Sequence, residues 1–503
     1  MVKIPFQNIA LSSALVVLGL PLRAAEDLGA MWGTAEEEAN YYPLVDIPIP
    51  PGVPMRPGSF EILPDGRLAV GTRRGDVYFI SGAFDSPPKP VYHLFASGQD
   101  EIFGLAWKDG SLTITQFGEV TKLSDTNGDG TADRFDTLSN NWGYAEGHEF
   151  AFGSKHDPEG NIWVVLGLSG SYKSHNLFRG WAVKVTEDGR MIPVCSGLRS
   201  PAGVAPNAEG AMFCIESQGP WNGSCSLKHL KPGGFLGHPA SYNWYPFVEG
   251  MDAPALEPNS NSRLLVEKRR VKELVPPAVL FPYIKMGRSI SGFRLNQTKG
   301  KFGPFEDQFF FGDYTLSLIM RATTEKINGV WQGACYPFRE GLSTGIMNVE
   351  FSPKGQLIAG GFTTNRQWPV RGVAPFAIQR LDWTGKIPFE IQEINIRPDG
   401  FLLTFTLPVD PVVGAQPGTY SLTTYTHKFS AGYGSPEVDH TTPVVSSAKV
   451  SDDGLSVRLV VKGIQESHIH DFDLAKMQSR QRLPLLHTKA YYTVNEIPAA
   501  KRP

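Results

Sequence analysis

Short runs of alternating apolar and polar residues, each followed by a turn that contains glycine, recur along most of the chain. Alternation with a period of two is typical of a β-strand with one buried face, and Asp-Gly or Lys-Gly between two such runs predicts a β-hairpin. The copies begin at Phe60, Gly104, Phe150, Gly203, Lys301 and Val349. Where neighbouring copies are clear, they are spaced by about 45 to 50 residues, which is the period of a four-stranded blade.

These repeats predict an all-β protein whose main body, residues 59–385, is a six-bladed β-propeller. One hairpin cannot bury both of its faces, whereas radial stacking of the repeats buries them all. The interval between the fourth and fifth copies is nearly twice the usual one, and residues 218–288 show no strand periodicity. We expect this segment to form long loops on one face of the propeller and not a seventh blade.

A different pattern follows the last repeat. Strand-like segments separated by turn residues lie near positions 400–407, 419–426, 444–450, 455–461 and 490–494. Their spacing of about 8 to 12 residues is typical of a sandwich. We therefore expect residues 386–503 to form a small C-terminal β-sandwich domain. Residues 26–58, which contain several prolines, are expected to form an extended lead-in to the propeller.

Residues 1–25 have the three parts of a signal peptide. Lys3 supplies a positive charge, an apolar stretch runs from about Ile9 to Leu22, and Ala24 and Ala25 are small residues that suit a cleavage site. A membrane anchor is the alternative, but the apolar stretch is shorter than the ~20 residues that a span needs, and no other segment could cross a bilayer. We expect a bacterial protein that is secreted or periplasmic.

Export affects the expectation for the cysteines, which are Cys195, Cys214, Cys225 and Cys335. In an oxidising compartment they can form up to two disulfides, with three possible pairings, and free buried thiols are the alternative. None of them lies in a C-x-x-C-H motif, so the chain carries no covalent haem site. The formal net charge of −3 and the lack of a basic run give no reason to expect nucleic acid as a partner.

The segment SDTNGDGTADRFD has the spacing of a calcium-binding loop. Calcium prefers about six to eight hard oxygen ligands, and Gly130 allows the tight turn around which alternating positions converge. The candidate ligands are Asp125, Asn127, Asp129, Thr131, Asp133 and, as the closing carboxylate, Asp136. The alternative is a polar hairpin turn without a metal.

Three further positions could carry chemistry at the channel. His148 precedes a strand of the third repeat, where propeller loops meet the channel, and a neutral imidazole there can act as a general base. Arg199 heads the fourth repeat and can hold an oxyanion. The Gln218-Gly219-Pro220 turn closes the next strand, and its carbonyl oxygens can bind calcium. A structural histidine, an ion pair between blades and an ordinary turn are the alternatives.

The stretch SGLRSPAGVAPNAEGAMFCIESQGPWNG resembles the central segment of the soluble, quinone-dependent glucose/sorbosone dehydrogenase family. GQDEIFGLAW, GHEFAFG and FSPKGQL resemble three other segments of that family, whose members are six-bladed propellers that use pyrroloquinoline quinone with calcium. This likeness covers about residues 59–385. Nearly the whole chain after residue 25 resembles a secreted planctomycete and verrucomicrobial group of dehydrogenase-like or haem-binding propeller proteins, which often carry a c-type cytochrome domain.

The resemblance implies a role for each matching residue. His148 would take the hydroxyl proton of a sugar or alcohol while hydride passes to the quinone. Arg199 would contact the quinone oxygens, and Gln99 would lie in the same pocket. The Gln218-Gly219-Pro220 turn would belong to the cofactor site, with the carbonyl oxygens of Gly219 and Pro220 as ligands of the catalytic calcium.

The chain departs from the family where the family binds the three carboxylates of the cofactor. The family has a lysine and two arginines there, and Thr315, Gly345 and Met347 align with them. Glu101 also stands where the family has glycine. Without those cations the cofactor would lose charge-assisted hydrogen bonds worth about 1.5 to 3 kcal/mol each. Four arginines elsewhere could replace them: Arg321, Arg339, Arg366 and Arg371.

Three functions follow from these observations. The first is an exported, calcium-dependent, quinoprotein-like dehydrogenase that oxidises a sugar or an alcohol and passes electrons to a separate acceptor such as a cytochrome c. The second is a non-catalytic propeller that binds carbohydrate or a partner protein, with the C-terminal domain as an adhesion or spacer module. The third is a metal-dependent hydrolase or lactonase, which would need carboxylates that face the channel.

Overall fold

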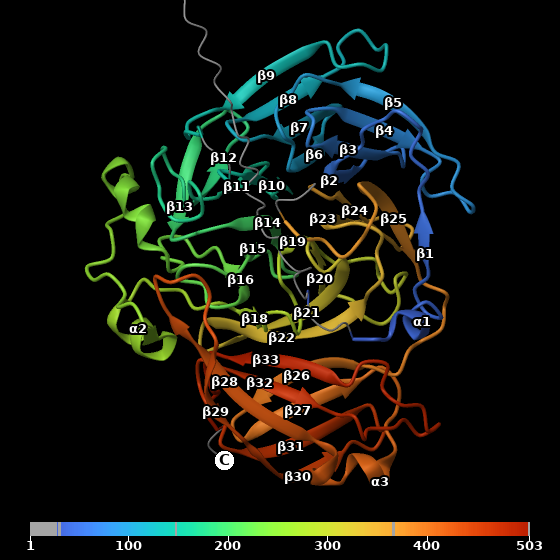
Figure 1. Cartoon of the computed structure of the whole chain (residues 1–503), viewed down its shortest axis with the longest axis vertical. Helices are drawn as coiled ribbons and strands as arrows, with labels where there is room; N and C mark the ends of the chain where they lie inside the picture. Colours follow the sequence, from blue (N-terminus) through green and yellow to red (C-terminus); the bar gives the residue numbers. More distant parts are fainter. Residues whose placement is uncertain (1–27, 29–31, 146–147, 365–367, 501–503) are drawn as a thin grey trace, which may run out of the picture.

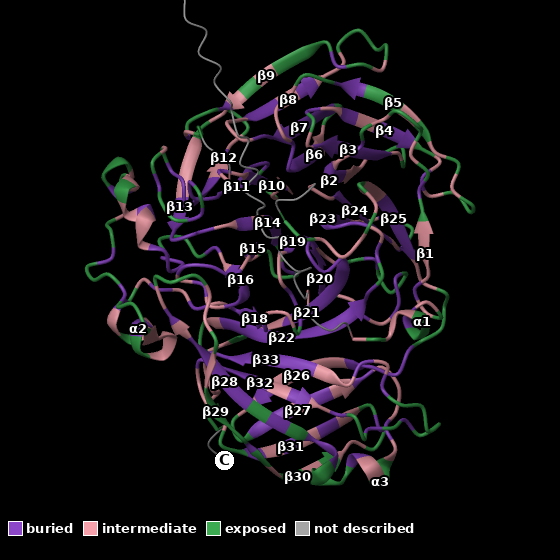
Figure 2. Cartoon of the chain, viewed as in Figure 1, coloured by how far each residue is buried: buried purple, intermediate pink, exposed green. Residues whose placement is uncertain are grey.

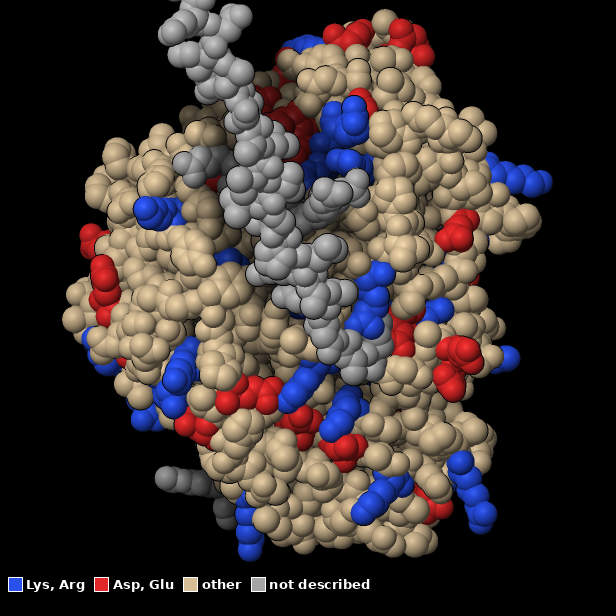
Figure 3. All heavy atoms as spheres, in the orientation of Figure 1, with Lys and Arg blue, Asp and Glu red and all other residues tan. Residues whose placement is uncertain are grey.

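The structure, a computed structural model, describes residue 28 and residues 32–145, 148–364 and 368–500. The predicted signal peptide, residues 1–25, lies outside these ranges. Within them, no helix is long and apolar enough to cross a membrane. On the face that Figure 3 shows, basic and acidic side chains are interspersed.

Six groups of four antiparallel strands form a ring (Figure 1). Blades one to three are β2 (Pro57–Ile62), β3 (Leu68–Thr72), β4 (Val77–Ser81), β5 (Val91–Ala96); β6 (Gly104–Lys108), β7 (Ser111–Thr115), β8 (Val120–Ser124), β9 (Arg134–Ser139); and β10 (Ala151–His156), β11 (Ile162–Leu166), β12 (Trp181–Val185), β13 (Met191–Ser196). Blades four to six are β14 (Pro201–Pro206), β15 (Met212–Glu216), β16 (Cys225–His229), β18 (Val279–Phe281); β19 (Ile290–Leu295), β20 (Phe309–Asp313), β21 (Leu318–Ile327), β22 (Val330–Arg339); and β23 (Ile346–Phe351), β24 (Gln356–Phe362), β25 (Phe376–Asp382), β1 (Leu44–Asp46).

The first strands of the blades contact one another around the ring. The order of contacts is β2, β6, β10, β14, β19 and β23, and β23 contacts β2 again. The closed order confirms the six-bladed β-propeller that the repeats predict. Apolar side chains of consecutive blades fill the space between them, so that Phe103, Phe152 and Val204 share one buried cluster. Figure 2 shows the consequence, because the strands near the axis are buried and the outer strands β5 and β9 are largely exposed.

The N-terminal segment closes the ring. It contains the short helix α1 (Ala35–Glu38) and then β1, which pairs with β25 in the register Leu44–Leu381 and Asp46–Gln379. The last blade therefore takes its outer strand from the beginning of the chain. The expected extended lead-in is thus partly a strand, because β25 would otherwise present unpaired backbone groups at the edge of its sheet.

The long interval between the fourth and fifth repeats does not form a seventh blade. It supplies the two outer strands of blade four, β16 and β18, which the sequence reading missed. Between these strands the chain forms a 3-10 helix η1 (Pro239–Phe247), the two-residue strand β17 (Ser262–Arg263) and the helix α2 (Leu264–Arg270). The strands were missed because β16, CSLKH, has no alternating pattern and is buried over nearly its whole length.

The C-terminal part is a β-sandwich. One layer is β26 (Ile391–Arg397), β27 (Gly400–Phe405), β31 (Ser456–Lys462) and β30 (Val444–Val450), and the other contains β28 (Ser421–Phe429), β29 (Glu437–Thr441), β32 (His468–Asp473) and β33 (Lys489–Val494). The connection after β27 holds α3 (Pro411–Gly414) and the short 3-10 helix η2 (Pro417–Thr419). Side chains such as Leu403 and Leu459 from the first layer pack against Phe472 and Tyr492 from the second.

The sandwich and the propeller share one sheet. β33 pairs with β22, the outer strand of blade five, in the register Gly333–Thr493 and Cys335–Tyr491. The result is a nine-stranded sheet that runs from β17 through β28, β32, β33 and β22 to β19, with β29 beside β28. Backbone hydrogen bonds therefore fix the C-terminal domain to the propeller, which the sequence pattern does not indicate.

All four cysteines are free and buried. Burial raises the pKa of each thiol. The disulfides expected from export are therefore not formed in this structure, and the alternative of free buried thiols holds. Each of these cysteines lies in a strand, where a small apolar side chain fits the core.

A buried charged cluster joins α1, blade five and the C-terminal domain. His487 lies between two carboxylates, with its Nε2 2.8 Å from Glu38 Oε1 and its Nδ1 2.6 Å from Glu390 Oε1. Arg339 in β22 lies 3.1 Å from the other oxygen of Glu38. Burial alone would lower the pKa of His487, but the charges of Glu390 and Glu38 and their hydrogen bonds outweigh it and raise the pKa to about 9.

We expect stability to fall as the pH rises from about 6.5 to about 9. Because the folded state binds the His487 proton more tightly than the unfolded state, this contribution is complete below the ordinary pKa and is lost as the pH passes about 9. The free energy of unfolding should fall by about 3 kcal/mol over this range. His487→Gln should reduce the fall in melting temperature between pH 6 and pH 9.5, while the same substitution at the exposed His175 should leave it unchanged. An equal fall in all three proteins would contradict the assignment.

Candidate active site at the mouth of the ring

Loops from all six blades meet at one end of the ring. In each blade the first two strands run antiparallel, so the loop that enters the first strand and the loop that leaves the second lie at the same end. A cavity of about 150 Å³ opens there. That volume is roughly ten times what one water molecule needs, so a small organic molecule can enter.

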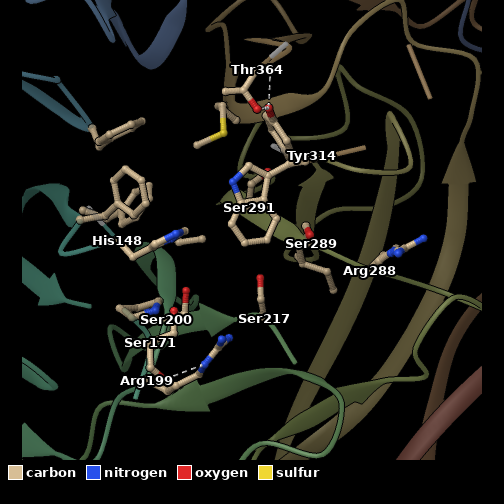
Figure 4. Close-up of a pocket in the computed structure, with 18 of the residues that line it drawn as sticks. His148, Ser171, Arg199, Ser200, Ser217, Arg288, Ser289, Ser291, Tyr314 and Thr364 are labelled. Atoms are coloured by element: carbon tan, nitrogen blue, oxygen red, sulfur yellow. Dashed lines mark hydrogen bonds between the residues drawn. The ribbon is translucent and has the colours of Figure 1, made fainter. Parts of the chain in front are cut away.

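The cavity wall combines aromatic rings, hydroxyl groups and a few cationic side chains (Figure 4). The aromatic residues are Phe103, Phe150, Phe152, Tyr314, Phe362, Trp368 and Tyr433. The hydroxyl groups come from Ser171, Ser200, Ser217, Ser289, Ser291 and Thr364. No Asp or Glu is among the described residues that line the cavity. Such a wall suits a ligand with both hydroxyl groups and apolar faces, as a sugar has.

His148 reaches into this cavity from the loop before β10 (Figure 4). Its imidazole packs edge-on against Trp368, with ring centroids 5.3 Å apart. Burial and then the charges of Arg199 and Arg73 lower the pKa of His148. The imidazole is therefore neutral at pH 7 and can accept a proton.

The backbone of His148 is held in an unusual conformation. Its φ is +72°, in the left-handed region that non-glycine residues rarely adopt. Behind it, the fully buried Arg179 donates hydrogen bonds to the carbonyl oxygens of Gly143, Glu149, Phe150 and Phe117. These bonds connect both sides of the His148 loop to one rigid group.

The carboxylate of Glu149 restrains the same loop. It is fully buried and accepts hydrogen bonds from the backbone N–H of Ala145 at 2.7 Å and from Asn176 Nδ2 at 2.7 Å. Its charge also partly offsets the effect of burial on Arg179, whose pKa is lowered to about 10. Two buried groups of opposite charge thus restrain the loop on both sides of the left-handed histidine.

Arg199 belongs to the loop between β13 and β14 and lines the same cavity (Figure 4). Its Nη1 donates to the carbonyl oxygen of Gln218 at 2.8 Å, and its Nε donates to that of Ser171 at 3.3 Å. The buried carboxylate of Glu216 accepts the backbone N–H of Arg199 and lies 2.5 Å from Lys228 Nζ. This ion pair fixes the backbone of Arg199 in the cavity wall.

Two other arginines contribute less positive charge to the cavity. Arg73 Nε lies 2.7 Å from Glu101 Oε2, so the carboxylate that departs from the family pattern neutralises this cation. Arg288 lies at the edge of the cavity, and in Figure 4 its guanidinium points away from the centre. Its guanidinium carbon lies 5.9 Å from the ring centroid of Tyr283.

The structure brings His148 and Arg199 together, as predicted, but not the other predicted residues of this site. Gln99 is not among the described lining residues, and its amide oxygen is 3.5 Å from Gln116 Nε2. Gln218, Gly219 and Pro220 lie behind Arg199 and do not line the cavity. The guanidinium of Arg199 packs on this turn, since a Cβ at Gly219 would clash with its carbon, and it donates to the carbonyl oxygen of Gln218.

The carbonyl oxygen of Gly219 does not fit a calcium ligand. It accepts the backbone N–H of Asn222 at 3.1 Å and that of Gly434 at 3.2 Å. Two N–H donors use both lone pairs of the oxygen and would repel a cation. The described lining also offers no carboxylate to complete a calcium shell. Of the two calcium donors that the resemblance implies, the carbonyl oxygen of Gly219 is therefore already occupied by N–H groups.

The described residues also offer no matching set of cations for the three carboxylates of pyrroloquinoline quinone. Of the positions aligned with the family's lysine and arginines, Met347 lines the cavity, Thr315 bonds to Ser289 and Gly345 is enclosed by backbone. Among the possible replacements, Arg321 is buried against the C-terminal domain, Arg339 pairs with Glu38 and Arg371 lines another cavity. Arg366 lies outside the described residues. Among the described lining residues, Arg199 and the paired Arg73 face the cavity and Arg288 points away from its centre, which suits a ligand with about one or two anionic groups.

The predicted calcium loop at residues 125–136 is a compact turn between β8 and β9. Asp125 accepts the backbone N–H of Gly128 and Gly130, both at 2.8 Å, and Asp133 accepts that of Thr126 at 2.8 Å. Asp136 lies in β9 and forms an ion pair with Arg134 at 2.8 Å. Asn127, Asp129 and Thr131 complete the turn through further bonds between its side chains and backbone. Within the described residues, no three acidic, histidine or cysteine side chains are placed to hold a metal, and calcium binding here stays a prediction.

The sequence reading missed several lining residues. Arg73 follows the second strand of its repeat, the position that Ser217 occupies in blade four, so a comparison of the repeats could have indicated it. Tyr433 belongs to the C-terminal domain, and no repeat pattern connects it with the ring. Its contribution depends on tertiary structure alone.

No known family profile matches the chain, and no curated protein matches it in sequence. Among solved structures, it is similar to a putative oxidoreductase (glucose dehydrogenase) from Thermus thermophilus, with 17% identity, a TM-score of 0.46 and coverage of 68% of this chain and 99% of that one. It is also similar to the quinone-bound aldose sugar dehydrogenase of Streptomyces coelicolor, with 15% identity, a TM-score of 0.46 and coverage of 67% and 97%. A putative gluconolactonase has 10% identity, a TM-score of 0.40 and coverage of 68% and 92%. Likenesses of this degree assign neither an activity nor a cofactor to the chain.

Arg179 and Glu149, with their hydrogen bonds to the His148 loop, are here called the clamp. The clamp predicts a large effect of Arg179→Gln. The substitution leaves several buried carbonyl oxygens without a donor and Glu149 without a counter-charge, which should cost about 3 to 5 kcal/mol of unfolding free energy. The matched control is Arg190→Gln on the same blade, because the Arg190 side chain is 73% exposed. That change should stay within about 0.5 kcal/mol. Urea unfolding measures both, and similar midpoints for the two variants would refute the clamp.

Proposed function

We propose that the protein oxidises a hydroxyl group of a sugar or an alcohol in the cavity at the mouth of the ring, with His148 as the base. In this reaction the O–H proton goes to the imidazole of His148, and hydride leaves the carbon that bears the hydroxyl for a two-electron acceptor such as a quinone, which is thereby reduced. The hydroxyl becomes a carbonyl. Arg199 lies beside the same cavity and can stabilise the negative charge that develops on the oxygen. Export and a separate cytochrome c as final acceptor belong to the same proposal.

One observation carries this proposal. A histidine with a lowered pKa stands in a strained backbone conformation, clamped by buried charges and facing a cavity of ligand size. A histidine that served packing alone would gain nothing from such strain, whereas a base must be held in one orientation toward its substrate. The cavity wall of hydroxyl groups and aromatic rings suits a sugar.

Binding without catalysis is the second candidate, and the occupied Gly219 carbonyl oxygen favours it. If the chain descends from a calcium-dependent enzyme, the N–H groups of Asn222 and Gly434 now stand where the cation would be bound. The cavity would then hold a sugar without oxidising it. A hydrolase or lactonase receives less support, since the described lining lacks the carboxylates that its metal would need.

His148→Asn tests the catalytic role. With a redox dye as acceptor and a panel of aldoses and alcohols, we expect kcat to fall about 100- to 10,000-fold, with little change in KM. The wild-type rate should rise with pH through a pKa below the ordinary histidine value, since the charged form is inactive, and the variant should lack this rise.

His175→Asn, at an exposed position, is the matched control and should keep wild-type kinetics. The assay is run with and without added calcium and pyrroloquinoline quinone. Full turnover by the His148 variant would exclude this residue as the base. Sugar binding in calorimetry without turnover under any of these conditions would establish the second candidate.

A further inference from the structure

We propose that the C-terminal domain is part of the ligand site, and that Tyr433 stacks against the ring of a bound sugar and so selects cyclic over open-chain substrates. This inference deepens the function proposed above. It concerns the loop at residues 430–436, between β28 and β29, in the domain that the second sequence-based hypothesis treats as an adhesion or spacer module. This loop is here called the arm.

The arm reaches from the sandwich to the mouth of the ring. Tyr433 lines the cavity, although every other described lining residue belongs to the propeller. Its ring lies over the guanidinium of Arg199, with the centroid 5.0 Å from the guanidinium carbon. The side chain of Tyr433 nevertheless stays 56% exposed, so much of its surface is available to a ligand in the cavity.

Hydrogen bonds to the turn at residues 217–223 hold the arm in place. Trp221 N donates to the carbonyl oxygen of Ser430 at 2.7 Å, Gly434 N donates to that of Gly219 at 3.2 Å, and Ser435 N donates to that of Gly223 at 3.2 Å. The sandwich below is itself bonded to blade five through β33 and β22. The arm is thus anchored on both sides of Tyr433, so Tyr433 does not need to be ordered when a ligand binds.

Two glycines permit this close approach. Gly434 has a φ of +65°, and a Cβ at this position would lie 2.7 Å from Gln218 Cδ. At Gly223 a Cβ would lie 2.7 Å from His427 Cβ. Larger residues at these two positions would push the C-terminal domain away from the turn at residues 217–223. Glycine in both segments therefore allows the contact.

The chemistry of the cavity indicates which ligand the arm recognises. A pyranose has apolar C–H faces and hydroxyl edges, and an exposed aromatic ring beside serine hydroxyl groups matches both. Ser171, Ser200 and Ser217 stand near Arg199 in Figure 4, on the side of the cavity where the arm arrives. An open-chain polyol has the same hydroxyl groups but no flat face, so it gains nothing from an aromatic platform. Stacking on Tyr433 therefore favours the cyclic sugar.

D-glucose and D-sorbitol are the matched probes, and titration calorimetry with the full chain is the readout. Tyr433→Ala should weaken glucose binding roughly 3- to 10-fold and leave sorbitol binding within about 2-fold. Tyr433→Phe and Tyr433→Trp keep the aromatic face and should bind glucose as the wild type does. Tyr172→Ala is the control, because Tyr172 is 52% exposed and lies next to Ser171 but does not line the cavity.

The outcomes separate this inference from the proposed function. Equal losses for glucose and sorbitol in Tyr433→Ala would mean that Tyr433 only supports Arg199, and the inference would fall while His148 could still be catalytic. Unchanged glucose binding in Tyr433→Ala would overturn it as well. If the wild type binds glucose through Tyr433 but oxidises no sugar, the inference about Tyr433 holds and the dehydrogenase proposal fails. If the wild type binds neither probe, the inference falls.

Discussion

The contact of six inner strands around one axis is the constraint on which the rest of this molecule depends. Each blade can bury its faces only against its neighbours, so the ring must close, and β1 closes it by pairing with the last blade. Closure sets the direction of every inner strand. As a consequence, the loops before the first strands and after the second strands meet at one mouth, and residues far apart in the sequence share a cavity.

Buried charges then turn this scaffold into a site with fixed geometry. Arg179 and Glu149 hold the loop that carries His148, and the Glu216–Lys228 pair holds the backbone at Arg199. Burying such groups is costly unless every one is paired, and several of these hydrogen bonds go to backbone atoms of the site loops. The molecule therefore uses buried polar interactions where position matters and apolar packing between the blades.

The C-terminal domain extends the sheet of blade five and also contributes a residue, Tyr433, to the cavity wall. Its sheet continues blade five, which covers the edge of β22, and the same arrangement aims the arm at the cavity. The N–H of Gly434 in the arm also bonds to the carbonyl oxygen that the resemblance would give to calcium. The arm thus supplies an aromatic side chain to the cavity wall and also occupies the carbonyl oxygen of Gly219.

The sequence by itself determined the fold class, because turn glycines and alternating strands record local structure that every blade repeats. It also indicated His148 and Arg199, which both lie shortly before the first strand of their repeats. Only the tertiary structure decided that Gln99 and the Gln218-Gly219-Pro220 turn lie outside the cavity, and that Trp368 and Tyr433 line it. These positions depend on contacts across hundreds of residues, such as Gly434 with Gly219 and β33 with β22. Periodicity carries no information on such contacts, because pairing between distant segments is set by the shape and hydrogen bonding of the folded chain and not by the pattern within either segment.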